Sequence, residues 1–276
     1  MERVALMGAG GKMGFRLAGK LTDAGFDLRC VEPNEAGRER LRDAGHEVLG
    51  QADALEGADV VVLAVPDKLI KPVAESFVPD LPPGTMVVSL DPAAPVAGEL
   101  PARDDITYFV THPCHPSVFK DEAYPAARRD HFGGVAKQAI VCALMQGPEE
   151  DYQRGERIAK AMWAPVSRSH RISVEQMAIL EPALAETVSI TLLRAIHEAM
   201  ETAIACGVPG EAARDFITGH LGVELAIVFG EIDAQFSDGA LKAAERAASV
   251  ILQPNWKDVF EPENIRAEIK EITRRE

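Results

Sequence analysis

Two histidines in a proline-rich hexapeptide are the first candidates for chemistry. The residues Thr111-His112-Pro113-Cys114-His115-Pro116 directly follow an apolar run. An imidazole titrates near neutral pH, so it can take the proton from a substrate hydroxyl group. The prolines stiffen the loop and would hold the rings in place. We therefore expect His112 and His115 to be catalytic.

Two other interpretations of this hexapeptide stay open. One or both histidines can be ordinary loop residues that bond to the backbone. Cys114 can act as a nucleophile, although nothing else in the sequence points to a covalent intermediate.

A carboxylate at the start of a long helical stretch is the second candidate. Glu181 stands between Leu180 and Pro182, which is an unfavourable place for a solvated side chain. Imidazole and carboxylate together suit zinc or a similar divalent cation. We expect His112 and Glu181 to bind such an ion, zinc or magnesium. The alternative is a helix-end carboxylate bonded to nearby N–H groups.

The first residues of the chain predict the element that would hold a cofactor. Arg3 to Met7 are mostly apolar, a glycine-rich turn follows, and a helical pattern begins near Phe15. Glycines let a pyrophosphate approach the backbone, and a helix N-terminus offers N–H groups and partial positive charge. The residues predicted to contact the cofactor here are Gly8, Gly10, Gly11, Lys12, Met13 and Gly14. A glycine-rich turn in an unrelated α/β domain is the alternative.

An acid at the end of the next apolar run indicates which dinucleotide would bind. Glu32 follows the run 26–31 and can accept hydrogen bonds from the ribose hydroxyls of adenosine. Its charge would repel the 2′-phosphate of NADP, and no arginine occupies positions 33–37. The sequence therefore predicts NAD.

The rest of the first 172 residues alternates strands with helices. Further strands are predicted at 48–49, 59–65, 85–90, 106–111, 138–145 and 166–172, and the main helices at 35–44, 52–56, 67–70 and 149–162. This alternation predicts an α/β fold with a Rossmann-type, doubly wound and mostly parallel sheet. Ligands bind at the carboxyl ends of such strands, where Gly10, Glu32, Pro66, Asp91 and His112 fall. Pro66 is accordingly a further expected cofactor contact.

After Ser173 the pattern becomes helical to the end of the chain. A long helical stretch is expected over 173–206, with an irregular backbone near Pro182, and later helices at 211–218, 221–236, 239–252 and 263–276. We expect domains at 1–172, which binds NAD, and 173–276, which is all-helical. Apolar helices rich in alanine and glycine favour close packing, so we expect a homodimer through the helical domain.

Composition excludes several classes of function. The 276 residues carry a formal net charge of −14, which argues against binding nucleic acid or an anionic membrane surface. The four cysteines show no paired spacing, and no leader or membrane span is evident. We expect a cytoplasmic protein.

These residues together resemble the superfamily of 6-phosphogluconate and β-hydroxyacid dehydrogenases, ketol-acid reductoisomerase and prephenate dehydrogenase. The resemblance implies a dinucleotide domain joined to a helical domain that dimerises. His112-Pro113 is similar to the His-Pro pair with which prephenate dehydrogenases bind the substrate hydroxyl. Where β-hydroxyacid enzymes place a catalytic lysine, this sequence has Glu181 and no lysine between 161 and 241. That departure is closer to the reductoisomerases, whose acids bind metal.

A narrower resemblance rests on 8–14, 111–116 and the helix start Ser173-Val174-Glu175-Gln176-Met177. It implies an NAD-dependent enzyme that oxidises a small anionic branched sugar acid and shifts a carbon. Prephenate-type, imine-reducing and β-hydroxyacid dehydrogenases are the enzyme alternatives, and Arg128, Arg168, Arg171 and Arg194 leave prephenate chemistry open. A non-catalytic NAD-binding sensor or scaffold is the alternative from another class.

Overall fold

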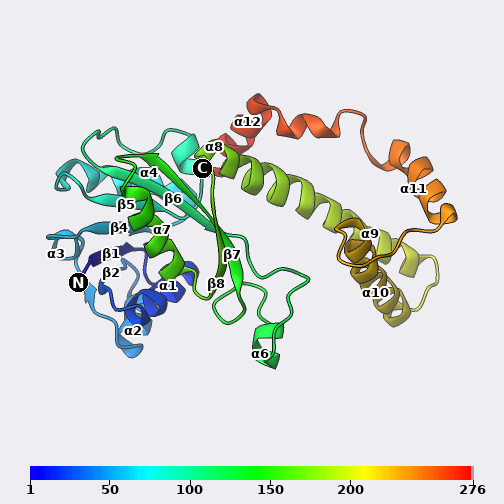
Figure 1. Ribbon diagram of the computed structural model, residues 1–276, viewed down its shortest axis with the longest axis horizontal. Coiled ribbons are helices and arrows are strands. Elements are labelled where there is room, and N and C mark those ends of the chain that lie inside the picture. The colour runs from blue at the N-terminus through cyan, green and yellow to red at the C-terminus, as the bar shows by residue number, and fades with distance from the viewer. Residues whose placement is uncertain (275–276) are drawn as a thin grey trace. The chain divides into compact units, whose positions relative to one another are not determined.

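The computed structural model describes residues 1–274, and the chain in it forms two compact units (Figure 1). The first unit contains Met1–Ile179 and the C-terminal residues from Arg266 onward. The second unit contains Leu180–Ile265. Each unit is described separately below.

An eight-stranded sheet is the centre of the first unit. Its order is β3-β2-β1-β4-β5-β6-β7-β8, and every neighbouring pair is parallel except β6 and β7. The predicted doubly wound, mostly parallel sheet is therefore confirmed. The strands are β1 (Arg3–Met7), β2 (Asp27–Val31), β3 (Val48–Leu49), β4 (Val60–Leu63), β5 (Met86–Ser89), β6 (Thr107–Pro113), β7 (Gln138–Gln146) and β8 (Val166–Arg171).

Helices cover both faces of this sheet (Figure 1). One apolar cluster joins alternate residues of β1 and β4 to α1, α2 and α7, and a second joins the intervening residues to α3, α4 and α5. Burial on both faces explains the continuous apolar runs of the strands. The helices are α1 (Lys12–Asp23), α2 (Glu35–Asp43), α3 (Gln51–Leu55), α4 (Asp67–Glu75), the 3₁₀-helix η1 (Val78–Asp80), α5 (Ala93–Val96), α6 (Pro125–Arg128), α7 (Asp151–Met162) and α8 (Val174–Ala178).

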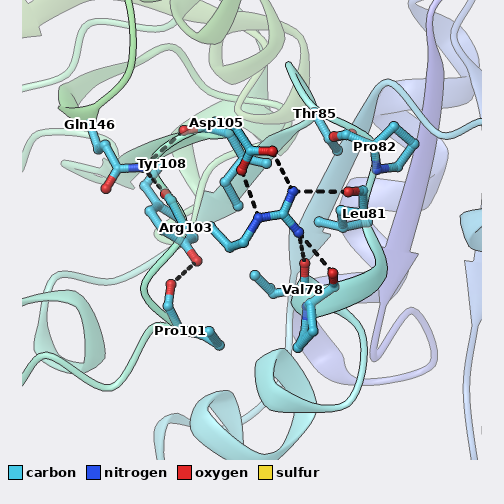
Figure 2. A network of polar contacts seen from close by, with 11 residues as sticks. Val78, Leu81, Pro82, Thr85, Pro101, Arg103, Asp105, Tyr108 and Gln146 are labelled. Carbon is cyan, nitrogen blue, oxygen red and sulfur yellow. Dashed lines mark hydrogen bonds and ion pairs between the residues drawn. The ribbon is translucent and has the colours of Figure 1, made fainter.

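A polar network fixes the segment that enters β6 (Figure 2). The Arg103 guanidinium donates to the backbone oxygens of Val78, at 2.8 Å, and Leu81, at 3.1 Å. It also forms a two-point ion pair with Asp105, at 2.6 and 2.8 Å. The Tyr108 hydroxyl, on β6, donates to the Pro101 oxygen at 2.5 Å. The network thus holds the start of the strand whose other end carries His112.

The second unit is helical. The wide π-helix η2 (Ile179–Ile190), which starts at the last residue of the first unit, leads into α9 (Thr191–Ala205), followed by α10 (Gly210–Val228), α11 (Asp238–Ile251), the 3₁₀-helix η3 (Trp256–Phe260) and α12 (Pro262–Ile272), which returns to the first unit. The helix predicted at 263–276 corresponds to α12, and its last two positions lie outside the described residues.

The two helices predicted at 211–218 and 221–236 are wrong, because α10 is one helix. Gly219 lies inside it, and a glycine lowers helix stability without ending a helix. The helix ends at Val228 with Phe229 as its C-cap, and the next residue, Gly230, adopts a φ of +70°. Residues 231–236 are bends and coil instead of helix. No helix within residues 1–274 combines the length and apolar character needed to cross a bilayer.

Candidate active site

The predicted cofactor turn connects β1 to α1. Gly8 has a φ of +78°, and a Cβ atom there would come within 2.6 Å of the Ala64 oxygen. The turn therefore requires glycine at this position. Gly11 is the N-cap of α1, Lys12 and Met13 begin the helix, and its first turn has no acid. Its N-terminal N–H groups are suited to an anion such as a pyrophosphate.

Glu32, directly after β2, lies against this turn. Its Oε2 atom accepts a hydrogen bond from the Gly10 N–H at 2.8 Å, and its Oε1 atom accepts one from the Asn34 N–H at 2.9 Å. A Cβ atom at Gly10 would come within 2.6 Å of Glu32 Cγ, so only glycine allows this approach. The acid thus occupies the position beside the glycine turn at which ribose hydroxyls are bound in dinucleotide folds.

Arg40 is a neighbour of the turn that the sequence did not single out. Its guanidinium donates to the Gly10 oxygen and lies 5.3 Å from the centre of the Phe15 ring. The α2 helix therefore holds the glycine turn from outside. Arg38, Arg40 and Arg42 all lie on this short helix. The sequence alone therefore does not indicate which of the three arginines contacts the glycine turn.

One cavity joins the cofactor turn to the predicted catalytic histidine. It has a volume of about 340 Å³ and includes Gly11, Lys12, Met13, Pro66, Asp67, Asp91 and His112 among its lining residues. We call it the His112 cavity. It lies at the carboxyl ends of β1, β4, β5 and β6, where a doubly wound sheet binds ligands.

His112 is oriented by the backbone at the end of β5. Its Nδ1 atom lies 2.9 Å from the Leu90 oxygen and 3.8 Å from Asp91 Oδ2. A carbonyl oxygen can only accept, so the ring proton is on Nδ1. The lone pair is then on Nε2, which is the atom able to take a proton or bind a metal. The half-buried ring therefore has the orientation of a base.

His115 lies nearby but lines another cavity. The ring centres of His112 and His115 are 6.4 Å apart. His115 has a φ of 59°, and its Nδ1 atom lies 3.1 Å from the Phe132 oxygen. It lines a cavity of about 460 Å³ together with Cys114, Lys120 and Arg168. His115 is therefore not among the residues that line the His112 cavity, although its ring contacts that of His112.

Two carboxyl groups that the sequence did not assign also line the His112 cavity. Burial and the charge of Asp91 raise the pKa of Asp67 from 3.8 to about 6, although a backbone hydrogen bond and His112 oppose the rise. Asp91 Oδ1 accepts the N–H of Ala93, the first residue of α5, at 2.7 Å. Each acid follows a buried strand within a few residues. This position near a strand end was the sequence feature that could have identified both acids as candidates for the site.

Glu181 lies in the second unit, two residues after Ile179. Ser173 and Gln176 form a reciprocal capping box at the start of α8, and the wide turns of η2 follow. Pro182 has no N–H to donate, and the Thr187 hydroxyl bonds to its oxygen at 2.8 Å. The irregular backbone predicted near Pro182 is confirmed.

A phosphate-binding turn, an acid after the second strand and an oriented imidazole at one sheet edge define a class of protein. It is the class of NAD-binding oxidoreductases with a Rossmann-type domain and a helical C-terminal domain. The sequence matches the family "Phosphogluconate dehydrogenase (decarboxylating) C-term" over residues 120–273. Residues 3–92 match "NADP oxidoreductase coenzyme F420-dependent". The predicted fold and class of enzyme are confirmed.

Individual relatives narrow the assignment. A D-apionate oxidoisomerase from Rhizobium rhizogenes is 55% identical over 99% of this chain and 100% of its own. One from Cupriavidus necator is 51% identical over 99% of both chains. A semialdehyde dehydrogenase NAD-binding protein from Cupriavidus necator, solved in complex with calcium and NAD, is 50% identical with a TM-score of 0.97, over 99% of this chain and 100% of its own. The chain belongs to the D-apionate oxidoisomerase family.

Proposed function

We propose that this chain oxidises D-apionate, a small anionic sugar acid, with NAD and shifts a carbon to give 3-oxo-isoapionate. The observation that carries this proposal is that His112 lines the same cavity as the cofactor turn, with Nδ1 held by Leu90. The names of the relatives support the substrate. The complex of a relative with NAD supports the cofactor.

His112 has the role of general base in this proposal. Its Nε2 atom takes the proton from the substrate hydroxyl while the hydride leaves the same carbon, which becomes a ketone. NAD, when bound, would be the hydride acceptor. The residues that would hold it are Gly8, Gly10, Gly11, Lys12, Met13, Gly14, Glu32 and Pro66. Asp91, at 3.8 Å, stabilises the imidazolium that forms. We assign a supporting role to His115, because its ring is near His112 but lines the neighbouring cavity.

A divalent cation is the second part of the proposal. Asp91 lies 3.8 Å from His112 within the first unit, and Glu181 is the further carboxylate that the sequence predicts as a metal ligand. Together they would offer one imidazole and two carboxylates, which is a donor set for a metal. The relative in complex with calcium supports a hard cation, which prefers oxygen ligands. We therefore propose that Asp91 and Glu181 bind calcium or magnesium and that His112 stays the base. With zinc, His112 would be a ligand, because its Nε2 lone pair serves one role at a time.

The helical residues provide a basis for dimerisation. Neither α9 nor α11 has a buried residue, although both carry large apolar side chains. Exposed apolar residues of the second unit include Leu184, Ile190, Leu193, Phe216, Val228, Val250 and Ile251. Soluble monomers rarely expose so much apolar surface. We propose a homodimer through residues 173–276, with 1–172 as the NAD-binding domain.

The cysteines indicate where in the cell the protein is located. Within residues 1–274, Cys30, Cys142 and Cys206 are free thiols. Unpaired cysteines are typical of reducing compartments, so we propose that the protein is cytoplasmic.

The decisive experiment supplies D-apionate and NAD to the purified protein. We expect NADH to form with D-apionate and a product whose carbon skeleton differs from that of the substrate, as carbon NMR would show. Glycerate and gluconate serve as control acids. If NADH binds but no NADH forms from D-apionate, the proposed substrate is wrong, whereas loss of NADH binding would contradict the class.

A further inference from the structure

One carboxylate folds the loop at residues 130–136, between β6 and β7, which we call the Asp130 loop. Each oxygen of Asp130 accepts two hydrogen bonds from the backbone, at 2.9 to 3.0 Å. The donors are the N–H groups of Phe132, Gly133, Val135 and Ala136. Burial raises the pKa of Asp130, but these four N–H groups outweigh it, so its pKa lies below the ordinary value of 3.8. The carboxylate is therefore charged at neutral pH and can hold all four donors.

Two glycines and the helix α1 complete the structure of the Asp130 loop. Gly133 and Gly134 have φ angles of +90° and +109°, which residues with a Cβ atom rarely adopt. On α1, Lys20 Nζ donates to the Gly134 oxygen at 2.8 Å. The Arg16 guanidinium, also on α1, lies 5.0 Å from the centre of the Phe132 ring. The loop is thus held from inside by its own carboxylate and from outside by the helix that begins at the cofactor turn.

The Asp130 loop carries the acceptor that orients His115. The Phe132 oxygen lies 3.1 Å from His115 Nδ1, and the two rings meet edge to face with their centres 6.0 Å apart. A carbonyl oxygen can only accept, so the ring proton is on Nδ1 and the lone pair is on Nε2. His112, whose ring centre is 6.4 Å away, has the same tautomer through Leu90. Each imidazole is therefore oriented by a backbone oxygen from a different segment of the chain.

We propose that Asp130 is a positioning residue for His115. By folding the loop, its carboxylate places the Phe132 oxygen where that oxygen fixes the His115 proton on Nδ1 and holds the ring beside His112. If the carboxylate is removed, the loop N–H groups must find other acceptors, and the Phe132 oxygen is no longer held in place. The claim that His115 supports turnover rests on the proposed function, whereas the orientation of its ring can be tested without any substrate.

Nitrogen NMR of the histidine rings tests the orientation. At about pH 8.5, where an ordinary imidazole is neutral, we expect His115 of the wild-type chain to carry its proton on Nδ1. In Asp130→Asn an amide nitrogen replaces one oxygen, so two of the four N–H groups lose their acceptor. We expect His115 in this variant to show a mixture of both tautomers. A His115→Gln spectrum identifies the signals of this ring.

Two other histidines are internal controls in the same spectra. His112 Nδ1 lies 2.9 Å from the Leu90 oxygen, and His220 Nδ1 lies 2.8 Å from the Phe216 oxygen. Neither acceptor belongs to the Asp130 loop. Both rings should therefore keep the proton on Nδ1 in Asp130→Asn, which shows that the change at His115 is local.

A second variant disturbs the same loop and keeps Asp130. Gly133→Ala places a Cβ atom at a φ of +90° and against the Gln138 side chain, so the loop cannot keep its path. We expect the same mixture of tautomers at His115. Gly84→Ala, at a φ of +80° in the turn before β5, is the matched control, because a Cβ atom there has no neighbour within 4 Å. This pair keeps the test valid if Asp130→Asn fails to fold.

Turnover with D-apionate tests the consequence for the reaction. We expect Asp130→Asn to lower kcat about tenfold, through the loss of one orienting hydrogen bond, with KM for NAD unchanged. His115→Ala should lower kcat by at least as much, and the double variant should be no slower than His115→Ala alone. A carboxylate that only stabilised the fold would slow both backgrounds equally. Asp104→Asn, an exposed change in the loop before β6, should retain full turnover.

Several outcomes would overturn the proposal. These are a proton on Nε2 of His115 in the wild-type chain, an Nδ1 proton retained in both loop variants, normal turnover in His115→Ala, and additive losses in the double variant. If the wild-type chain does not oxidise D-apionate, the proposed function is wrong, and the NMR comparison still decides whether Asp130 orients His115. The two failures are therefore distinguishable.

Discussion

His112 and Leu90 define the chemistry of this site, because the Leu90 oxygen lies 2.9 Å from His112 Nδ1 and fixes the ring proton there. Leu90 follows β5 and His112 is near the end of β6, and these strands are parallel neighbours. The tautomer is therefore set by the sheet itself. A rigid strand end orients a base more exactly than a flexible loop would.

The first prediction concerns this base. We expect His112→Ala to lower kcat about 100-fold or more, because the hydroxyl proton loses its acceptor. NADH binding should be unchanged, as fluorescence titration would show. His170→Ala, an exposed change on β8, is the control and should retain full turnover. Normal turnover in His112→Ala would contradict the assigned role.

Glu32 governs the second prediction, which concerns the choice of dinucleotide. Glu32→Ser removes an acceptor for the ribose hydroxyls and a charge that repels a 2′-phosphate. We expect KM for NAD to rise about tenfold and the ratio of kcat/KM for NADP over NAD to rise by at least as much. Glu39→Ser is the control, because Glu39 is an exposed acid on α2, the helix that follows Glu32. An unchanged ratio would show that Glu32 only holds Gly10.

The sequence was a good guide to the strands. The run 59–65 predicted β4, since burial on both faces leaves an unbroken apolar pattern. The glycine turn and Glu32 were equally clear, because close backbone approach needs glycine at fixed positions. The antiparallel direction of β7 was not predicted, because an apolar run does not encode strand direction.

The site was predicted less completely than the fold. His115 shares the pattern of His112, but it lines another cavity and has a φ of 59°, and the residue type alone does not predict either feature. Asp91 was noticed only as a strand-end residue and Asp67 only as part of a predicted helix, since their burial depends on packing between elements distant in sequence. The break predicted at Gly219 was wrong because local propensity is weaker than the helical context.

The third prediction is that divalent cations support turnover. We expect EDTA to reduce turnover with D-apionate and calcium or magnesium to restore it. Asp91→Asn keeps the hydrogen bond to Ala93 but removes a charge, so the calcium concentration for half-maximal turnover should rise about tenfold. Glu181→Gln should have the same effect, and Asp80→Asn, an exposed change, should have none. Full turnover in EDTA would exclude the cation.

Asp67 provides the fourth prediction, which concerns stability and pH. Its pKa in the folded chain, about 6, lies above the ordinary value of 3.8, so between these values the folded state binds more protons than the unfolded state. The unfavourable contribution of Asp67 is therefore absent below about pH 4 and complete above about pH 6. We expect Asp67→Asn to stabilise the protein by about 1 kcal/mol at pH 7.5, after allowance for solvent screening of a half-buried group.

Denaturant unfolding at several pH values in EDTA measures this effect. The difference between wild type and Asp67→Asn should shrink steadily from pH 6.5 to pH 4. Asp80→Asn serves as the matched exposed control. A difference that grows as the pH falls would mean that the carboxylate is stabilised by its surroundings, contrary to its burial beside Asp91.

The last prediction tests the dimer through α9, a helix in which no residue is fully buried. Leu193 on α9 is 54% exposed, and an arginine there would place an unpaired charge in an apolar interface. We expect Leu193→Arg to weaken dimerisation at least about 100-fold, because buried charges without partners are strongly unfavourable at interface cores. Sedimentation equilibrium would give wild type at twice the chain mass and the variant near the mass of one chain. Val118→Arg, an equally drastic change at an exposed apolar residue of the first unit, should remain dimeric. If wild type sediments as a single chain at micromolar concentration, the apolar helices of the second unit need another explanation.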